Sequence, residues 1–137
     1  MISVMGEDAA RDFHINIDHV VISIKSPGFR HVRLPKNVYR KARLKLKFHD
    51  IDREYPGLTE IFSPAHARRI LRFFKKHGGR HFLIHCEAGI SRSPAVAAAL
   101  TKAAGVDDSD YFKRYIPNRL VYRTILEETA PLKGRGE

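Results

Sequence analysis

The sequence predicts an α/β domain, because stretches typical of buried strands alternate with stretches typical of helices. Residues 20–24 (VVISI) are apolar and β-branched, as in a buried strand. After Ser63-Pro64, apolar side chains recur at helical spacing until Gly78-Gly79 ends the pattern. Residues 82–84 then indicate a further buried strand, and the alanine-rich stretch from Pro94 indicates a buried helix.

The remaining elements follow from shorter signals. Residues 44–48 (LKLKF) alternate apolar and basic side chains, which indicates a strand with one buried face. The acidic, turn-rich residues 50–59 are expected to form a loop at its carboxyl end, where α/β proteins commonly place their chemistry. Beyond the helix of residues 94–104, Ser109 is expected to cap a short helix, and Pro117-Asn118 to start the last one.

Length and composition indicate one domain. The chain has 137 residues, 43% of them hydrophobic, which is enough for a single core. We expect this domain over residues 13–130, with flexible ends at 1–12 and 131–137, because the N-terminal stretch has no period that would bury a face. No apolar run approaches the roughly 20 residues that cross a bilayer, and the N-terminal residues lack a signal pattern. We therefore expect a soluble, cytoplasmic protein, and we favour a monomer.

Positive charge is concentrated in one segment. The 25 Lys and Arg residues exceed the 15 Asp and Glu residues, and nine of the basic ones lie between Lys25 and Lys47, where no acidic residue occurs. This balance favours acidic partners, namely phosphorylated protein, phosphoinositide or nucleic acid. Nucleic acid is the least favoured of them, because the segment has few aromatic residues and no Gly-aromatic RNA-binding pattern. A solvated basic face without a partner is the alternative.

The only cysteine of the chain lies in the turn between the strand at residues 82–84 and the following helix. The turn reads HCEAGISRS, from His85 to Ser93, so that five residues separate Cys86 from Arg92. An arginine at this distance can hold two oxygens of a phosphate dianion while the sulfur lies beneath the phosphorus. The backbone amides of Glu87, Ala88, Gly89, Ile90, Ser91 and Arg92 are expected to hold the remaining oxygens. Arg92, these amides and the helix start would together stabilise the thiolate.

Three other positions of the turn have supporting roles. Gly89 allows the backbone angles of a tight cradle, Ser93 offers its hydroxyl to the sulfur when the thiolate leaves, and His85 is expected to brace the turn. Other kinds of loop fit less well. A nucleotide-binding loop needs Gly-Lys-Ser/Thr, and a zinc site needs about four ligands where only Cys86 and dispersed histidines occur. A rhodanese-like loop also contains a cysteine, but it does not have this His before the cysteine or Arg-Ser after it. Taken alone, Cys86 would more commonly be interpreted as a buried structural cysteine.

His-Cys, five residues with a central glycine, and Arg-Ser resemble the signature of the cysteine-dependent protein tyrosine phosphatase superfamily. Residues 88–93 (AGISRS) are especially similar to dual-specificity phosphatases, and the resemblance extends over about residues 20–128. It implies a three-layer fold with a central parallel or mixed sheet of about four to five strands flanked by helices. It also implies a phosphocysteine intermediate and neither a metal nor an organic cofactor. Asn118 matches the helix start near the end of these domains, which implies a supporting role.

The resemblance also implies a general acid on a loop some tens of residues before the cysteine. A carboxylic acid there protonates the leaving oxygen and, once ionised, activates water. Asp50 and Asp52 both qualify, and Asp50 is favoured because it directly follows the strand that ends near His49. The loop is longer than is common in the family, since Tyr55-Pro56-Gly57 precedes the helix, so Asp52 stays open as the alternative.

The expected substrates are phosphotyrosine and phosphoserine or phosphothreonine in proteins. Family members that act on phosphoinositides or RNA ends tend to carry extra basic residues in the signature, whereas this chain has Glu87 and Ile90. The basic segment nevertheless leaves open a polyanion such as phosphoinositide or RNA 5′-phosphate. A phosphate-binding module with little turnover is the alternative from a different functional class.

Overall fold

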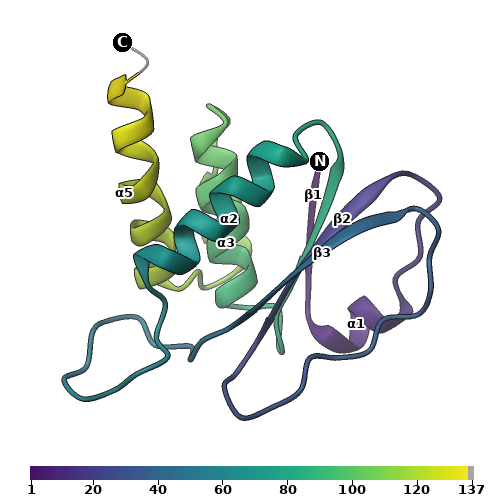
Figure 1. The fold of residues 1–137 in the computed structure, drawn as a ribbon, viewed down its shortest axis with the longest axis horizontal. Coiled ribbons are helices and arrows are strands. Elements are labelled where there is room, and N and C mark those ends of the chain that lie inside the picture. Colours follow the sequence, from purple (N-terminus) through teal and green to yellow (C-terminus); the bar gives the residue numbers. More distant parts are fainter. Residues whose placement is uncertain (136–137) are drawn as a thin grey trace.

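The computed structural model describes residues 1–135 (Figure 1). The elements follow one another as β1 (Ile2–Met5), α1 (Glu7–Asp12), β2 (His19–Lys25), β3 (Arg40–Lys47), α2 (Pro64–Lys76), β4 (His81–His85), α3 (Arg92–Ala103), α4 (Ser109–Arg114) and α5 (Arg119–Arg135). The four strands form one sheet in the order β1-β4-β2-β3, and every pairing is parallel. The predicted α/β class and the sheet of about four to five strands are confirmed.

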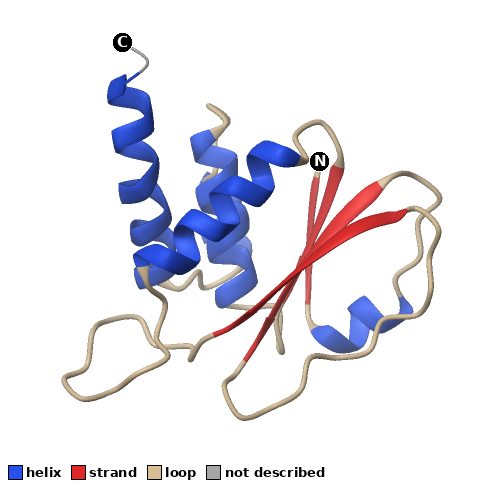
Figure 2. Ribbon diagram, in the orientation of Figure 1, coloured by secondary structure: helices blue, strands red, loops and turns tan. Residues whose placement is uncertain are grey.

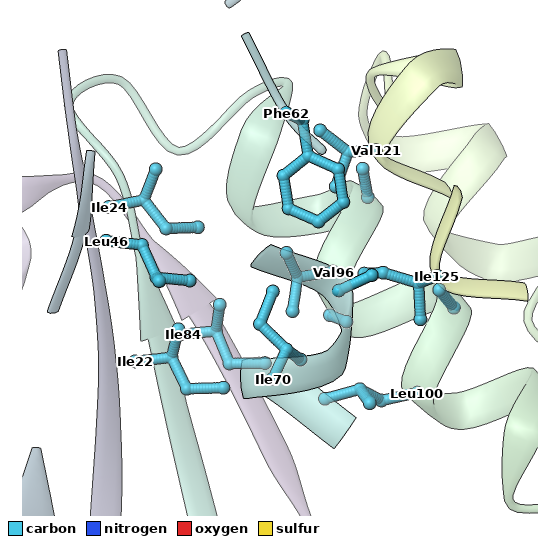
Figure 3. Close-up of a cluster of buried hydrophobic side chains, with 14 of the residues drawn as sticks. Ile22, Ile24, Leu46, Phe62, Ile70, Ile84, Val96, Leu100, Val121 and Ile125 are labelled. Carbon is cyan, nitrogen blue, oxygen red and sulfur yellow. The ribbon is translucent and has the colours of Figure 1, made fainter. Parts of the chain in front are cut away.

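The two faces of the sheet are covered unequally (Figure 2). One face packs against α2, α3 and α5, and the larger apolar core lies there (Figure 3). In that core Ile22 and Ile84 from the strands face Ile70 of α2 and Val96 of α3. The other face is covered by α1, the residue after it and the chain between β2 and β3, over a small cluster that includes Val21. The three layers therefore consist of a thick helical layer, the sheet and a thin layer.

The predicted helix signals are found where expected, with small shifts. Ser63 caps α2: its hydroxyl accepts from the backbone N–H of His66, and the His66 ring accepts from the N–H of Ser63, which makes a capping box. α3 is buried along most of its length, as its alanine-rich sequence predicts, but it begins two residues before Pro94. Because of this earlier start, Arg92 and Ser93 project from its first turn.

Regular secondary structure occurs at both chain ends, where the sequence predicts flexible segments. Residues 2–5 form β1, which pairs with β4 from Ile2↔Phe82 to Met5↔His85, and α1 follows at once. A four-residue edge strand is too short to show a clear period, and the partner strand supplies its hydrogen bonds. At the other end, α5 continues as far as Arg135, so residues 131–135 are helical, while 136 and 137 lie outside the described residues.

Parallel pairing brings the carboxyl ends of all four strands to one edge of the sheet. Gly6 follows β1, Ser26 follows β2, Phe48 follows β3 and Cys86 follows β4. Four segments that are distant in sequence therefore meet at this edge, which is where open α/β sheets bind ligands.

Candidate active site

Cys86 lies at the floor of the turn between β4 and α3, the cysteine loop (residues 86–92). Its side chain is buried, and the sulfur has two polar neighbours. The backbone N–H of Gly89 donates to Sγ at 3.2 Å, and Ser93 Oγ lies 3.1 Å from Sγ. An N–H group can only donate, and a hydroxyl donates when its neighbour is an anion, so both groups would stabilise a thiolate.

Arg92 is held in place from one side of its guanidinium. Nη1 donates to Phe48 O at 3.0 Å and to Ser26 Oγ at 3.1 Å, and Nη2 donates to Glu87 Oε1 at 2.9 Å. Nε is buried and has no hydrogen-bond partner among the residues that the structure describes. A guanidinium has five N–H groups, so the two that remain belong to Nε and Nη2. These adjacent donors form the pair that binds two oxygens of a phosphate side by side.

The carboxylate of Glu87 is hydrogen-bonded to Arg92 and Ser26 and is therefore not an unpaired charge beside the cysteine loop. Its carboxylate accepts from Arg92 and from the backbone N–H of Ser26 at 3.0 Å, and it is also hydrogen-bonded by the Ser26 hydroxyl. Lys25 Nζ lies 3.8 Å from its Oε2. Burial raises the pKa of Glu87, but the hydrogen bonds from Ser26 and Arg92 outweigh it and lower the pKa to about 2. The carboxylate is therefore ionised and neutralised by its partners, which weakens the expectation that Glu87 disfavours highly charged substrates.

The N-terminal residues support the cysteine loop from the thin side. The N–H of Cys86 donates to Met5 O at 3.4 Å, and the N–H of Glu7 donates to Glu87 O at 3.1 Å. Gly89 has φ of +76°, and a Cβ on it would lie 2.4 Å from Gly6 N. Glycine is thus required at residue 89 by the backbone of the β1–α1 turn as well as by its own torsion angle. The positive φ agrees with the backbone angles expected from sequence, and the close contact with Gly6 is a second reason that the sequence did not reveal.

His85 is buried in the sheet and connected to two side chains on neighbouring strands. Arg43 Nε donates to Ser23 Oγ at 2.8 Å, so the hydroxyl hydrogen of Ser23 is free to point at His85 Nε2, 2.7 Å away. The other ring nitrogen, Nδ1, is buried and has no hydrogen-bond partner among the described residues. Burial, followed by the charge of Arg43 among the lowering causes, lowers the pKa of His85 to about 4, so the ring is neutral at ordinary pH. A buried neutral ring in this position suits bracing better than proton transfer to a substrate.

The two candidate acids occupy different surroundings. Asp50 Oδ1 accepts from Ser91 Oγ at 2.9 Å and from Asn118 Nδ2 at 2.8 Å, so it lies against the cysteine loop. Asp52 Oδ1 lies 3.5 Å from Arg53 Nε, and both side chains are exposed. Asp50 is therefore hydrogen-bonded to the cysteine loop and to Asn118, whereas the one charged neighbour found for Asp52 among the described residues is Arg53.

Asn118 connects three segments at the other side of the loop. Besides Asp50, its Nδ2 donates to Ile51 O at 3.0 Å, and its backbone N–H donates to Ser91 O at 3.0 Å. Its Oδ1 accepts from Val121 N at 3.0 Å in the first turn of α5. The buried side chain of Asn118 thus fixes the positions of two segments relative to the cysteine loop. These are the loop after β3, which carries Asp50, and the start of α5.

A hollow of about 320 Å³ lies beside the cysteine loop, and both candidate acids, Asp50 and Asp52, line it together with Tyr55, Ser91, Ile116 and Asn118. Tyr55 is 45% and Ile116 76% exposed, and they give the hollow an apolar rim. Among the described residues, no group of three or more His, Cys, Asp or Glu side chains is placed to hold a metal ion. No helix among the described residues is both long and apolar enough to span a membrane.

Several residues of the site were not identified from sequence. Ser26, Glu7 and Lys25 support Glu87, and Ser23 and Arg43 orient His85. The place of Ser26 directly after a buried strand is a usable signal, because the residues that follow parallel strands converge at one edge of the sheet. Ser23 and Arg43 gave no sequence signal, since their partners lie on neighbouring strands and depend on register.

Comparison with known proteins places this geometry in a family. A family model described as the tyrosine phosphatase family matches residues 9–134. No curated protein sequence matches the chain. The solved structure of human DUSP28 aligns with a TM-score of 0.65 at 17% identity over 98% of this chain and 94% of its own.

Two further solved structures have the same fold. DUSP15 aligns with a TM-score of 0.55 at 18% identity over 98% of this chain and 86% of its own. PTPMT1 in complex with PI(5)P has a TM-score of 0.55 at 16% identity over 89% and 82% of the two chains. At such identities the likeness shows the fold, while the family match spans nearly all of the described residues. The chain therefore belongs to the tyrosine phosphatase family and has the fold of its compact dual-specificity members.

Proposed function

We propose that the protein hydrolyses phosphomonoesters through a phosphocysteine intermediate on Cys86. The observation that carries this proposal is the unpartnered, buried Nε of Arg92. A buried donor without a partner costs about 1–3 kcal/mol unless a ligand satisfies it. The donor lies in the same loop as a sulfur that receives an N–H from Gly89, so a bound phosphate dianion would satisfy Arg92 above the nucleophile.

In the first step the Cys86 thiolate attacks phosphorus, and the bond from phosphorus to the leaving oxygen breaks. Arg92 and the loop amides bind the equatorial oxygens, where charge accumulates. The leaving oxygen takes a proton from the carboxyl group of Asp50, which is held against Ser91 and Asn118. The products of this step are the free alcohol or phenol and phosphocysteine.

In the second step water attacks the phosphocysteine, and the bond between phosphorus and sulfur breaks. The Asp50 carboxylate accepts a proton from this water, which restores the acid for the next cycle. The departing thiolate is stabilised by the N–H of Gly89 and by the hydroxyl of Ser93, both within 3.2 Å of Sγ. Inorganic phosphate is the second product.

Phosphorylated protein is the substrate class that the rim of the site favours, with phosphotyrosine ahead of phosphoserine and phosphothreonine. Ile90 of the cysteine loop is 51% exposed, and its carbonyl accepts from the backbone N–H of Ile116 at 3.0 Å. Ile116 and Tyr55 are exposed and line the hollow beside the loop. An aromatic leaving group would bury part of this apolar surface, whereas an inositol ring or a ribose would not. A polyanion such as phosphoinositide or RNA 5′-phosphate is the second candidate, because the charge of Glu87 is compensated by Arg92 and Lys25.

The reaction is tested by hydrolysis of p-nitrophenyl phosphate and by trapping the intermediate. We expect turnover by the wild type, competitive inhibition by vanadate, and a phosphorylated Cys86 peptide after rapid acid quenching. Cys86→Ser should retain the fold and show no turnover. A wild type that binds phosphopeptide but hydrolyses none of these substrates would contradict the proposed enzyme and favour a phosphate-binding module.

The substrate class is tested by comparing kcat/KM for phosphotyrosine peptide, phosphoserine peptide, phosphoinositide and 5′-phosphorylated RNA. We expect the phosphotyrosine peptide to give the highest value, with weak dependence on salt. A higher value for either polyanion, falling steeply as salt increases, would favour the second candidate, since screened charges then dominate binding.

A further inference from the structure

The outer side of β3 is an edge of the sheet. β3 is the last strand in the order β1-β4-β2-β3 and pairs only with β2 among the described residues (Figure 2). With eight residues it is the longest strand of the sheet. Parallel sheets are normally enclosed, and an uncovered edge presents backbone groups that can pair with another extended chain.

On the side of the thick layer, α2 borders this edge with a row of positive charges. A hollow of about 240 Å³ is lined by Leu44 of β3 and by Arg69, Arg72, Phe73 and Lys76 of α2. Leu44 and Phe73 are half-buried and form an apolar floor, whereas the three basic residues are exposed. Arg69 Nη2 lies 3.5 Å from Lys45 O, so the basic row of the helix reaches the strand itself. We call Leu44 and these four α2 residues the edge groove.

On the thin-layer side, the same strand presents a second set of positive charges. Arg43, Lys45 and Lys47 pair with Val21, Ser23 and Lys25, so their side chains alternate to the face opposite Leu44. Lys45 and Lys47 are exposed. Burial first, and then the charges of these three residues and Lys25, lower the pKa of nearby His31 to about 4. Both faces of the edge strand are therefore basic.

These charges have no acidic partners in the part of the chain that the structure describes. The ion pairs that α2 and β3 do form involve other basic residues of these two elements. Arg68 of α2 pairs with Glu128 at 2.6 Å, and Lys41 of β3 pairs with Asp18 at 3.6 Å. Lys45, Lys47, Arg72 and the remaining cations of the groove have none within 4.0 Å there. These charges therefore create a positive potential along the outer, unpaired edge of β3.

We propose that β3 and the edge groove bind an extended acidic segment of a partner protein, which adds to the sheet as a fifth strand. Backbone pairing with β3 would give the register. Side chains of the added strand alternate between its two faces. Apolar ones would lie over Leu44 and Phe73, and acidic ones would meet Lys45 and Lys47. Two copies of this chain would oppose lysine to lysine, so the same charges that prevent self-pairing select an acidic partner. This surface is separate from the cysteine loop, so the proposal does not depend on catalysis.

The probe is a peptide as long as β3 in which Glu and Val alternate, and the matched control peptide has Gln in place of Glu. We expect the Glu peptide to bind at least about tenfold more tightly at low salt, because several charge pairs form across a solvated surface. Amide hydrogen exchange between residues 43 and 47 should slow in the complex. Lys45→Glu and Lys47→Glu should each weaken binding at least about fivefold, because the acidic side chains of the added strand face these two residues. Lys75→Glu makes the same charge change on an exposed α2 residue outside the groove, so it should bind nearly as the wild type does.

Several outcomes would overturn the proposal. Equal affinity for the Gln peptide would show that charge does not contribute to binding. Equal loss in Lys75→Glu and Lys45→Glu would show that only the net charge of the protein matters and that β3 has no specific role. Displacement of the peptide by vanadate would place the peptide at Cys86. Slower exchange of residues 43–47 with phosphatidylserine vesicles, and not with the peptide, would assign the surface to a lipid bilayer.

Discussion

The two sides of the cysteine loop are built differently. On one side, the phosphate flank consists of Gly6, Glu7, Lys25, Ser26 and Glu87, which hold Arg92 and the loop backbone by hydrogen bonds, an ion pair and close backbone contact. On the other, the acid flank consists of Asp50, Ser91 and Asn118. There Asp50 is held by two hydrogen bonds, and the loop beyond Ile51 is exposed and projects from the molecule (Figure 1).

This difference matches two demands of the proposed reaction. The phosphate has the same position in both steps, so its ligands gain from being fixed before the substrate binds. The acid must reach leaving groups of different size and then a water molecule, so a short anchored residue on a loop is suited to it. The comparison predicts that changes in the phosphate flank affect both the fold and all substrates, whereas changes in the acid flank affect activity and depend on the leaving group.

The largest effect is expected from Arg92→Ala. Loss of the two free donors at Nε and Nη2 should lower kcat/KM on the order of 10⁴-fold for every substrate, because the charge of the transition state is no longer bound. Arg92→Lys should recover little, since an ammonium group lacks the planar pair of donors. Steady-state kinetics with circular dichroism as the check of folding measures this. Activity of Arg92→Lys near the wild-type value would contradict the role of the paired donors.

The second effect concerns the acid flank. Asp50→Asn keeps an oxygen that accepts from Ser91 and Asn118 but removes the proton, so kcat should fall on the order of 10³-fold with a phosphoserine peptide. With p-nitrophenyl phosphate the loss should be smaller, because that leaving group needs little protonation. Asp52→Asn is the matched control and should stay near the wild type with both substrates. If the two variants lose activity equally, Asp50 is not the specific acid.

The third effect tests the close contact in the phosphate flank. Gly89 and Gly28 both have positive φ, +76° and +87°, but only Gly89 has neighbouring backbone where a Cβ would lie. Gly28→Ala should lower the free energy of unfolding by about 1–2 kcal/mol, the cost of the left-handed conformation. Gly89→Ala should lower it by about 3 kcal/mol or more, because backbone must also move. Urea denaturation of both variants measures the difference, and equal losses would mean that the β1–α1 turn yields easily.

The smallest effect is a pH dependence of stability from Glu87. Its pKa in the folded protein is about 2, below the ordinary value of 4.5, so the unfolded chain binds the proton more readily. The stabilisation is therefore full above about pH 5 and is lost as the pH falls toward 2. Its size should be below about 1 kcal/mol, since the carboxylate is one-third exposed and screened by water. The gap in unfolding free energy between wild type and Glu87→Gln should close over this range, and a gap that widens would contradict the assignment.

Much of the fold could be predicted because its signals are local. The apolar run before Cys86, the alanine-rich stretch of α3 and the cap at Ser63 depend on neighbours within a few residues, and each appears in the structure. β1 was missed because a strand of four residues depends on its partner. The same limit applies to the site. The spacing of Cys86 and Arg92 is a property of one loop, whereas the choice between Asp50 and Asp52 depends on which one lies near Ser91.

The sequence by itself was enough to predict the proposed role of the loop from Cys86 to Arg92, because a cysteine, a glycine and an arginine at this spacing between a strand and a helix form one local unit. Tertiary structure decided what surrounds that unit. Parallel register brought Ser26 to Arg92 and Ser23 to His85, and the start of α5 brought Asn118 to Asp50. These partners are 66, 62 and 68 residues apart in the chain, so only the packing of strands and helices makes them neighbours.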